Sequence, residues 1–164
     1  MKRSVDSLIT SEKAYVFAHI KPDREIDITK MTEKDFVNNA FEFNAHLYLY
    51  NLGKTPAIIN KIAFDGVKSK TCPTKENLPE PKDPLIYFVG SSDNGVQQNQ
   101  FHFTINKDEL HKIHTDFSIT YYCFGYVKYT TIFRKKHTHG FCFELVAPHG
   151  QFIRTPDSEL NYDT

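Results

Sequence analysis

The sequence has no tryptophan, few glycines and no long apolar run, and each scarcity excludes a class of protein. Seven glycines and eight prolines in 164 residues exclude a collagen-like or low-complexity chain. No stretch approaches the ~18 consecutive apolar residues of a membrane-spanning helix. Residues 1–11 lack the apolar segment of a signal peptide. Aromatic residues nevertheless make up 14% of the chain, so the sequence predicts a folded domain rather than a disordered one.

Neither sign of charge is in excess, since 20 Lys and Arg residues balance 20 Asp and Glu residues. This balance argues against a uniformly basic protein that binds DNA. The three cysteines, Cys72, Cys123 and Cys142, are an odd number, which does not indicate a disulfide framework. Free thiols are typical of a reducing compartment, so we expect the chain to be cytoplasmic.

Alternation of apolar and polar residues is clearest between Phe41 and Tyr50, where it predicts a half-buried strand of an antiparallel sheet. We expect Phe41, Phe43, Ala45, Leu47 and Leu49 to face the core, with Glu42 and His46 in solvent. β-Branched and aromatic content predicts the further strands at residues 14–20, 57–64, 85–89, 101–105, 117–129, 138–146 and 151–154.

Turn and helix signals separate these strands. Residues 51–56 read as a turn in which Gly53 takes a positive φ, and Asp65-Gly66 closes the strand before it. Residues 21–35, 68–84 and 90–99 read as loops. A short helix is expected to begin at Asn106, with Glu109 three residues on, and another lies in residues 5–14. A turn near residues 134–136 sets Cys142 opposite residue 126, which argues against a bridge to Cys123.

Seven or eight strands without alternating helices predict an all-β fold. We expect an antiparallel immunoglobulin-like sandwich with one short helix, and a small closed barrel is the alternative. Residues 1–13 would be a short lead-in that follows a membrane anchor outside this chain, and residues 14–164 a single β-sandwich domain.

Catalytic and metal-binding signatures are missing from the sequence. Nothing resembles a nucleophile elbow, a phosphate-binding loop or a dinucleotide-binding glycine motif, so we expect no enzyme activity and no cofactor. His111 and His114 would share a helix face, and His137 and His139 a strand face. No cysteine-rich or carboxylate-bearing spacing supports zinc binding by these four, so no metal site is predicted.

A basic and aromatic cluster is the best candidate for a binding site. Lys128, Arg134, Lys135 and Lys136 fall in a stretch without acids, from Phe117 to Phe143. Cations suit phosphate groups, and aromatic rings can stack on a base. The predicted ligand-binding residues are Tyr126, Tyr129, Arg134, Lys135, Lys136 and His137. The alternative is a hairpin tip kept soluble by its charges.

Several motifs together resemble an uncharacterised bacterial family of membrane-anchored proteins with a C-terminal β-sandwich. The resemblance covers residues 11–163 and rests on Ser11–Val16, on the Asn-x-Gly-Lys-Thr-Pro-Ala turn at residues 51–57, on Gly125, Tyr129, Phe133, His137, Thr138, Phe141 and Cys142, and on residues 161–163. Thr131 stands where the family has Asp, and Arg134 where it has Gly, so the hairpin tip is more basic than is typical.

The resemblance implies a membrane anchor outside this chain and a place at the inner face of the membrane. We therefore expect a non-enzymatic regulatory domain that senses a ligand. A more specific hypothesis is that the ligand is a cyclic oligonucleotide, which is an anionic nucleotide, and that the domain acts in anti-phage signalling. This hypothesis rests on analogy of fold alone. The alternative is a protein–protein interaction module that binds a partner or a second copy through an exposed sheet edge.

Overall fold

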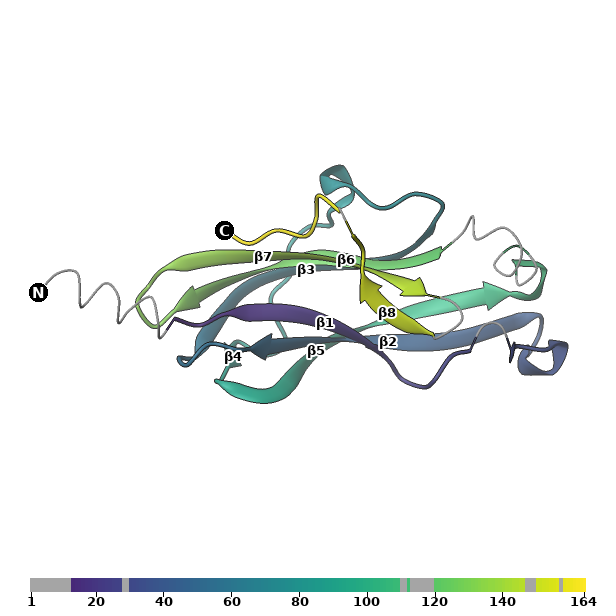
Figure 1. Cartoon of the computed structure of the whole chain (residues 1–164), viewed down its shortest axis with the longest axis horizontal. Helices are drawn as coiled ribbons and strands as arrows, with labels where there is room; N and C mark the ends of the chain where they lie inside the picture. Colours follow the sequence, from purple (N-terminus) through teal and green to yellow (C-terminus); the bar gives the residue numbers. More distant parts are fainter. Residues whose placement is uncertain (1–12, 28–29, 110–111, 113–119, 147–149, 157) are drawn as a thin grey trace, which may run out of the picture.

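Two antiparallel sheets form the molecule, a three-stranded sheet in the order β1-β2-β5 and a five-stranded sheet in the order β4-β3-β6-β7-β8 (Figure 1). The computed structural model describes residues 13–27, 30–109, 112, 120–146, 150–156 and 158–164, without the side chains of residues 92 and 93. The strands are β1 (Val16–Pro22), β2 (Ala40–Asn51), β3 (Ala57–Ser69), β4 (Phe88–Val89), β5 (Ser92–Asn106), β6 (Thr120–Thr131), β7 (Lys136–Val146) and β8 (Gln151–Arg154). Two short 3-10 helices, η2 (Glu33–Asp35) and η3 (Lys75–Asn77), lie in the connections.

The strand order is that of an immunoglobulin-like sandwich. In immunoglobulin notation β1, β2 and β5 take the places of strands A, B and E, and β3, β6 and β7 those of C, F and G. β4 beside β3 takes the place of C′, and β8 is an addition next to β7. No ladder joins the two sheets within the described ranges, so the expected sandwich is confirmed over the closed barrel.

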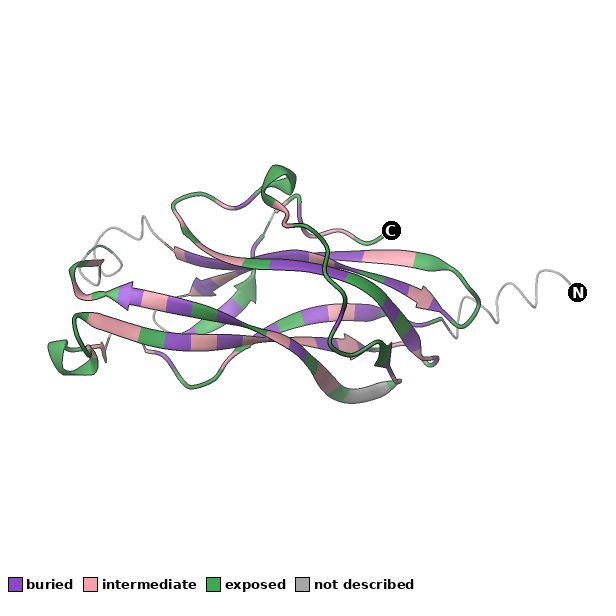
Figure 2. Cartoon of the chain, turned by 180° about the vertical axis from the view of Figure 1, so that it is seen from behind, coloured by how far each residue is buried: buried purple, intermediate pink, exposed green. Residues whose placement is uncertain are grey.

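β2 confirms the alternation expected from the sequence, as its banded colouring shows (Figure 2). Phe43, Ala45, Leu47 and Leu49 are buried, while Phe41 is only partly buried at the border of the core. Glu42 is exposed, and His46 is half-buried. Side chains that alternate along a strand lie on opposite faces, so the apolar set of β2 faces the second sheet.

Aromatic rings hold the two sheets together at the centre of the core. Phe43 of β2 stacks on Phe103 of β5, with ring centroids 5.2 Å apart. The ring of Tyr121, from β6, meets both edge-on, at 5.9 Å from Phe43 and 5.4 Å from Phe103. The Tyr121 hydroxyl donates a hydrogen bond to the Thr104 carbonyl oxygen at 3.0 Å, so the buried polar group is satisfied.

Three boundaries differ from those expected. Asp65-Gly66 does not end a strand, because β3 continues to Ser69 and Gly66 lies against the Phe103 ring. Residues 85–89 are not a buried strand, since only Phe88 and Val89 pair with β3 and only Val89 is buried. Residues 92–99, expected to be a loop, form the first half of β5. Of the expected helix at Asn106, residues 107–109 are helical, and the Asn106 N–H donates to Glu109.

Gly53 and the late hairpin also depart from expectation. Gly53 does not have a positive φ; its role is a close approach, because a Cβ there would overlap the backbone of Lys13 and Ala14. The hairpin register is shifted by two residues, so Cys142 faces Phe124 instead of residue 126. Cys123 lies in the main core and Cys142 in a second cluster on the other face of the sheet, which rules out a bridge between them. The helix expected within residues 5–14 falls almost wholly outside the described residues.

The alternation of β2 predicts unequal effects of two neighbouring substitutions. Leu47→Ala should lower the free energy of unfolding by about 2–5 kcal/mol, because it leaves a cavity in a fully buried site. His46→Ala should cost less than about 0.5 kcal/mol, because the contacts that it loses, with Gln97 and with the Tyr48 ring, lie at the surface. Denaturant unfolding of both variants measures the difference, and equal losses would contradict this register.

Candidate functional site

Two turns lie side by side at one end of the sandwich. Residues 132–135 join β6 to β7, and residues 52–56 join β2 to β3; Ala57 pairs with Thr131, which places the turns together (Figure 1). Arg134 has a φ of 59°, and its N–H donates to the Thr131 carbonyl oxygen at 2.9 Å. The backbone of Lys13 lies against Gly53, so the chain enters the described domain at this end.

This end combines exposed apolar side chains with exposed cations. Leu52, Ile132 and Phe133 are 62%, 51% and 39% exposed. We define the basic end as these three residues together with five exposed cations, Lys13, Lys54, Arg134, Lys135 and Lys136. No described Asp or Glu forms an ion pair with any of the five. The basic end is therefore a local concentration of positive charge without an ion-pair partner among the described residues, on a chain of zero net charge.

The six predicted ligand-binding residues are divided between the basic end, the outer face of the five-stranded sheet and the core. Arg134, Lys135 and Lys136 are exposed at the basic end. Tyr126 is half-buried on the outer face of the five-stranded sheet, with the Lys128 ammonium 5.2 Å from its ring centroid. Tyr129 is buried between the sheets, so its ring is not free to stack on a base.

His137 covers the Tyr129 ring, with centroids 5.3 Å apart. Its Nδ1 bonds the Thr164 main-chain oxygen at 3.1 Å, and its Nε2 is buried without a hydrogen-bond partner among the described residues. Sequence reasoning missed the exposed Ile132 and Phe133, although both directly precede the three cations in the chain.

The C-terminal segment adds to the free edge of β7 just behind the basic end. Thr138 and Thr164 exchange two backbone hydrogen bonds of 3.1 and 3.0 Å, and the Gly140 N–H donates to the Tyr162 carbonyl oxygen at 2.7 Å. Gly140 allows this approach, because a Cβ there would meet the Leu160 oxygen and the Tyr162 ring. The edge of β7 is thereby covered along residues 138–140.

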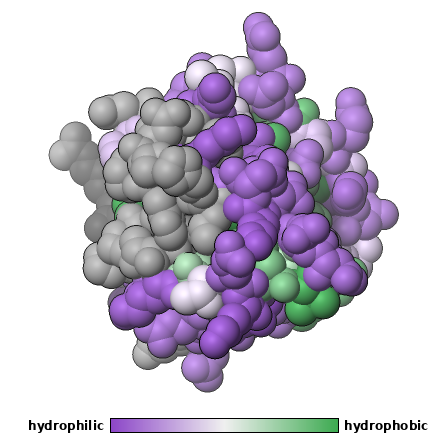
Figure 3. Space-filling view, turned by 90° about the vertical axis from the view of Figure 1, so that its right-hand side faces the viewer, coloured by the Kyte–Doolittle hydropathy of each residue, from purple (hydrophilic) through white to green (hydrophobic). Residues whose placement is uncertain are grey.

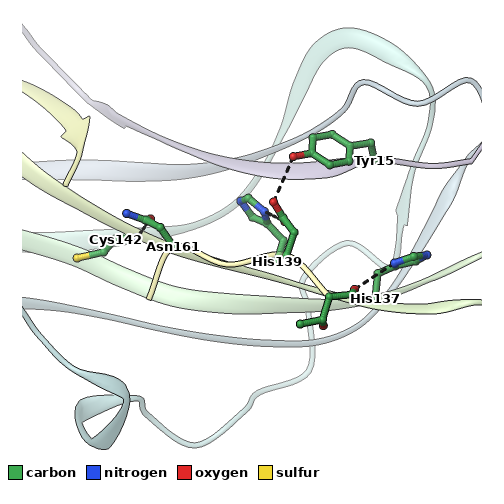
Figure 4. Close-up of polar contacts among 7 residues, drawn as sticks. Tyr15, His137, His139, Cys142 and Asn161 are labelled. Atoms are coloured by element: carbon green, nitrogen blue, oxygen red, sulfur yellow. Dashed lines mark hydrogen bonds and ion pairs between the residues drawn. The ribbon is translucent and has the colours of Figure 1, made fainter. Parts of the chain in front are cut away.

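One carboxylate joins three parts of the chain in this region (Figure 4). Asp163 accepts hydrogen bonds from His139 Nδ1 at 2.5 Å and from the Tyr15 hydroxyl at 3.2 Å. Burial lowers the pKa of His139 and outweighs the opposing attraction of Asp163. Burial, and then Asp163, raise the pKa of Tyr15. Within the described chain no serine, threonine or cysteine is bonded to His139. The two hydrogen bonds of Asp163 hold the C-terminal segment against β7 and against Tyr15.

A cavity of about 580 Å³ lies in the seam where β1 meets β8. Its lining includes His19, Tyr50 and Phe152, with charges of both signs from residues 21–25. Asp23 is hydrogen-bonded by Asn44 at 3.2 Å, and Arg24 donates to the Glu42 carbonyl oxygen and lies 4.5 Å from the Phe41 ring centroid. Because the carboxylates of Asp23 and Glu25 also line it, the seam is a weaker anion site than the basic end.

Large apolar side chains are also exposed along the β4 edge of the five-stranded sheet. We define this apolar edge as Ile58, Leu85, Ile86, Tyr87 and Phe88, which are 38% to 70% exposed. Ile58 pairs with both Phe88 and Thr130. The end of the molecule that carries η2, remote from β4 in Figure 1, is largely hydrophilic where its surface is described (Figure 3).

The remaining site expectations concern metals and membranes. His111 and His114 lie outside the described residues, so the four-histidine arrangement is not described. The described part of the chain holds no group of three His, Cys, Asp or Glu residues arranged for a metal ion. It also contains no helix with the length and apolarity needed to cross a bilayer.

Comparison with known proteins gives little similarity. No protein-family model matches the chain, and no curated protein matches it in sequence. Among solved structures, the crystal structure of a Bordetella pertussis protein described as ApaA aligns over 84% of this chain and 97% of its own, at 11% identity and a TM-score of 0.36. A similarity this low carries no argument about function.

The buried His139 predicts a loss of stability in mild acid. Its folded-state pKa lies below the ordinary 6.5, so the unfolded chain binds a proton more readily. Its contribution to stability is present above pH 6.5 and is lost as the pH falls from there towards the folded-state value.

Denaturant unfolding between pH 7.5 and 5.5 would measure this loss. The variant His139→Gln should show a shallower decline, and an unchanged slope would contradict the assignment. Partial burial and Lys21 lower the pKa of His19 as well. His19 therefore also makes stability fall with decreasing pH, and this part of the decline remains in His139→Gln. Asp163 and Arg154 are the charged groups that act on His139, and the Tyr15 hydroxyl donates to the same Asp163 carboxylate.

Proposed function

We propose that this chain is a non-enzymatic regulatory domain that works at a membrane surface and docks on anionic lipid headgroups through its basic end. The main support for this proposal is that exposed apolar and exposed cationic side chains follow one another at the hairpin tip. Ile132 and Phe133 project apolar surface directly beside three exposed cations, Arg134, Lys135 and Lys136. Apolar side chains that enter the headgroup region, with cations that meet lipid phosphates, are the usual means of peripheral membrane binding.

The expected binding free energies of these side chains favour reversible docking. A Lys or Arg near an anionic bilayer contributes about 1 kcal/mol, so the five exposed cations supply on the order of 5 kcal/mol at most. Full burial of an Ile or Phe side chain adds about 1.5–3 kcal/mol, and partial entry adds less. Neither contribution alone gives firm attachment, and together they give binding that salt weakens. Because the chain enters the domain at Lys13, an anchor preceding it would hold the basic end against the bilayer.

A cyclic oligonucleotide fits the same charges less well. None of the described cavities is lined by the six residues expected to bind it. Tyr129, one of the two rings expected to stack on a base, is buried beneath His137. The nucleotide hypothesis stays a prediction and is one outcome of the test below.

Vesicle sedimentation tests the proposal. The full chain should sediment with phosphatidylcholine vesicles that contain about 30% phosphatidylserine, and not with phosphatidylcholine alone, because the attraction is partly Coulombic. Replacing Arg134, Lys135 and Lys136 by Ala should weaken binding by at least about tenfold, since each cation is worth about 1 kcal/mol. The double variant Ile132→Ala with Phe133→Ala should weaken binding without changing its salt dependence.

A matched control removes three exposed lysines elsewhere, Lys34, Lys70 and Lys112, with the same change in net charge. This control should bind as the parent does. Equal losses in both triple variants, or no sedimentation at all, would overturn the proposal. If the chain does not bind vesicles but its melting temperature rises with cyclic di- or trinucleotides, the nucleotide hypothesis would replace this proposal.

A protein–protein interaction module is the second candidate, favoured by the apolar edge at β4. Its occupant in this proposal is the apolar edge of a second copy, which would pack its exposed apolar side chains against those of the first. Backbone pairing would be limited, because the Gln98 side chain already bonds the Ile86 N–H and carbonyl oxygen. Sedimentation velocity over a range of concentrations should then show a dimer, and Leu85→Asp with Phe88→Asp should abolish it. A chain that stays monomeric at high concentration would exclude this pairing.

A further inference from the structure

Two cysteines that are 70 residues apart in sequence meet on the outer face of the five-stranded sheet. Cys142 projects from β7, and Cys72 lies in the connection that follows β3. Their sulfur atoms are 3.8 Å apart. Together with Tyr122, Phe124 and Leu160, they form a second, small apolar cluster.

Independent contacts position the Cys72 thiol. Its sulfur lies 3.5 Å from the Ser158 hydroxyl oxygen. The helix η3, three residues further on, is fastened to the C-terminal segment, because the Lys75 N–H donates to the Glu159 carboxylate at 2.7 Å. On the other side, the Thr155 hydroxyl lies 3.7 Å from the Cys142 sulfur, and the Cys142 N–H donates to Asn161 Oδ1 at 2.9 Å (Figure 4). The two thiols therefore face one another without any rearrangement of the strands.

The two thiols differ in access to solvent. Cys72 is half-buried and lines an open cavity of about 270 Å³, together with polar residues that include Ser69, Thr71 and Asn77. Cys142 is fully buried, and burial raises its pKa to about 11. A small oxidant thus reaches Cys72 first, while burial keeps Cys142 protonated and out of contact with solvent.

We propose that Cys72 and Cys142 are a redox-sensitive pair that closes to a disulfide when the chain meets a peroxide. The Cys72 thiolate attacks one peroxide oxygen, the O–O bond breaks, and a sulfenic acid and hydroxide form. The Cys142 sulfur then attacks the Cys72 sulfur; the S–S bond forms, the S–O bond breaks, and water leaves with the Cys142 proton. In total two thiols and one hydrogen peroxide give one disulfide and two waters. A dithiol reductant reverses the crosslink by exchange.

Cys123 provides an internal comparison within the same chain. It is fully buried in the main core, on the opposite face of the sheet from Cys142. Burial raises the pKa of its thiol well above the ordinary value. Cys123 should therefore stay reduced while the other two thiols react.

Thiol counting and peptide mapping on the full chain test the proposal. Unfolding in guanidinium without reductant should expose three thiols before hydrogen peroxide treatment and one afterwards. The intact mass should fall by about 2 Da, and an unreduced digest should join the Cys72 and Cys142 peptides. Because the crosslink closes a long loop of the unfolded chain, the melting temperature should rise by about 5–10 °C and return on reduction.

Single variants separate the pair from general oxidation. Cys123→Ser should still lose both of its remaining thiols to the crosslink, and Cys72→Ser should form no intramolecular bond. Cys142→Ser should stop the reaction at the sulfenic acid of Cys72, which a dimedone probe detects even if the variant is less stable. Three titratable thiols after peroxide, or a linkage that contains Cys123, would overturn the proposal.

Discussion

The five-stranded sheet has to be covered on both of its faces, and much of the remaining structure follows from this requirement. β6 and β7 carry large apolar side chains alternately on each face: Cys123, Phe141 and Phe143 point into the sandwich, whereas Tyr122, Phe124 and Cys142 point away from it. A sheet of a two-layer sandwich normally exposes its outer face to water and keeps it polar. Here the outer face must be covered by segments that belong to neither sheet.

The connection after β3 and the C-terminal segment provide that cover. Leu78 from the first and Leu160 from the second pack on the outer face, and the Lys75–Glu159 hydrogen bond joins the two segments. The same requirement brings Cys72 to Cys142 and places Asp163 beside His139. The pairing of Thr164 with Thr138 lies two residues after Lys136, which is exposed at the hairpin tip.

Sequence reasoning succeeded where one face of a strand is apolar and the other polar. β2 alternates in this way, and four of the five residues predicted to face the core are buried, with Phe41 partly buried at its border. It failed at sheet edges. Residues 92–99 belong to β5, at an edge of the three-stranded sheet, and apart from Val96 and Gly95 they are polar, so they carry little apolar signal. Leu85 and Phe88 are apolar yet exposed, so their composition indicated a burial that does not occur.

The candidate site was predicted in part. Arg134, Lys135 and Lys136 were expected at a hairpin tip and are exposed there. Side chains alternate along β6, so Tyr129 faces the core as Val127 does. The prediction of Tyr129 as a ligand-binding residue did not take this alternation into account. The approach of Cys72 to Cys142 had no local signal, because it depends on how a long connection folds over the outer face.

The basic end and the cysteine pair each have one residue on β7, but the two proposed roles involve different parts of the molecule. Lys136 and Cys142 are six residues apart on β7, which at about 3.3 Å per residue separates them by roughly 20 Å. That distance exceeds the screening length at physiological salt, so a change at the thiols leaves the field at the basic end nearly unaltered. The connection that carries Cys72 runs on into β4, and a crosslink would hold one end of the segment that presents Leu85 to Phe88. Oxidation should therefore affect contacts made through the apolar edge before it affects docking at the basic end.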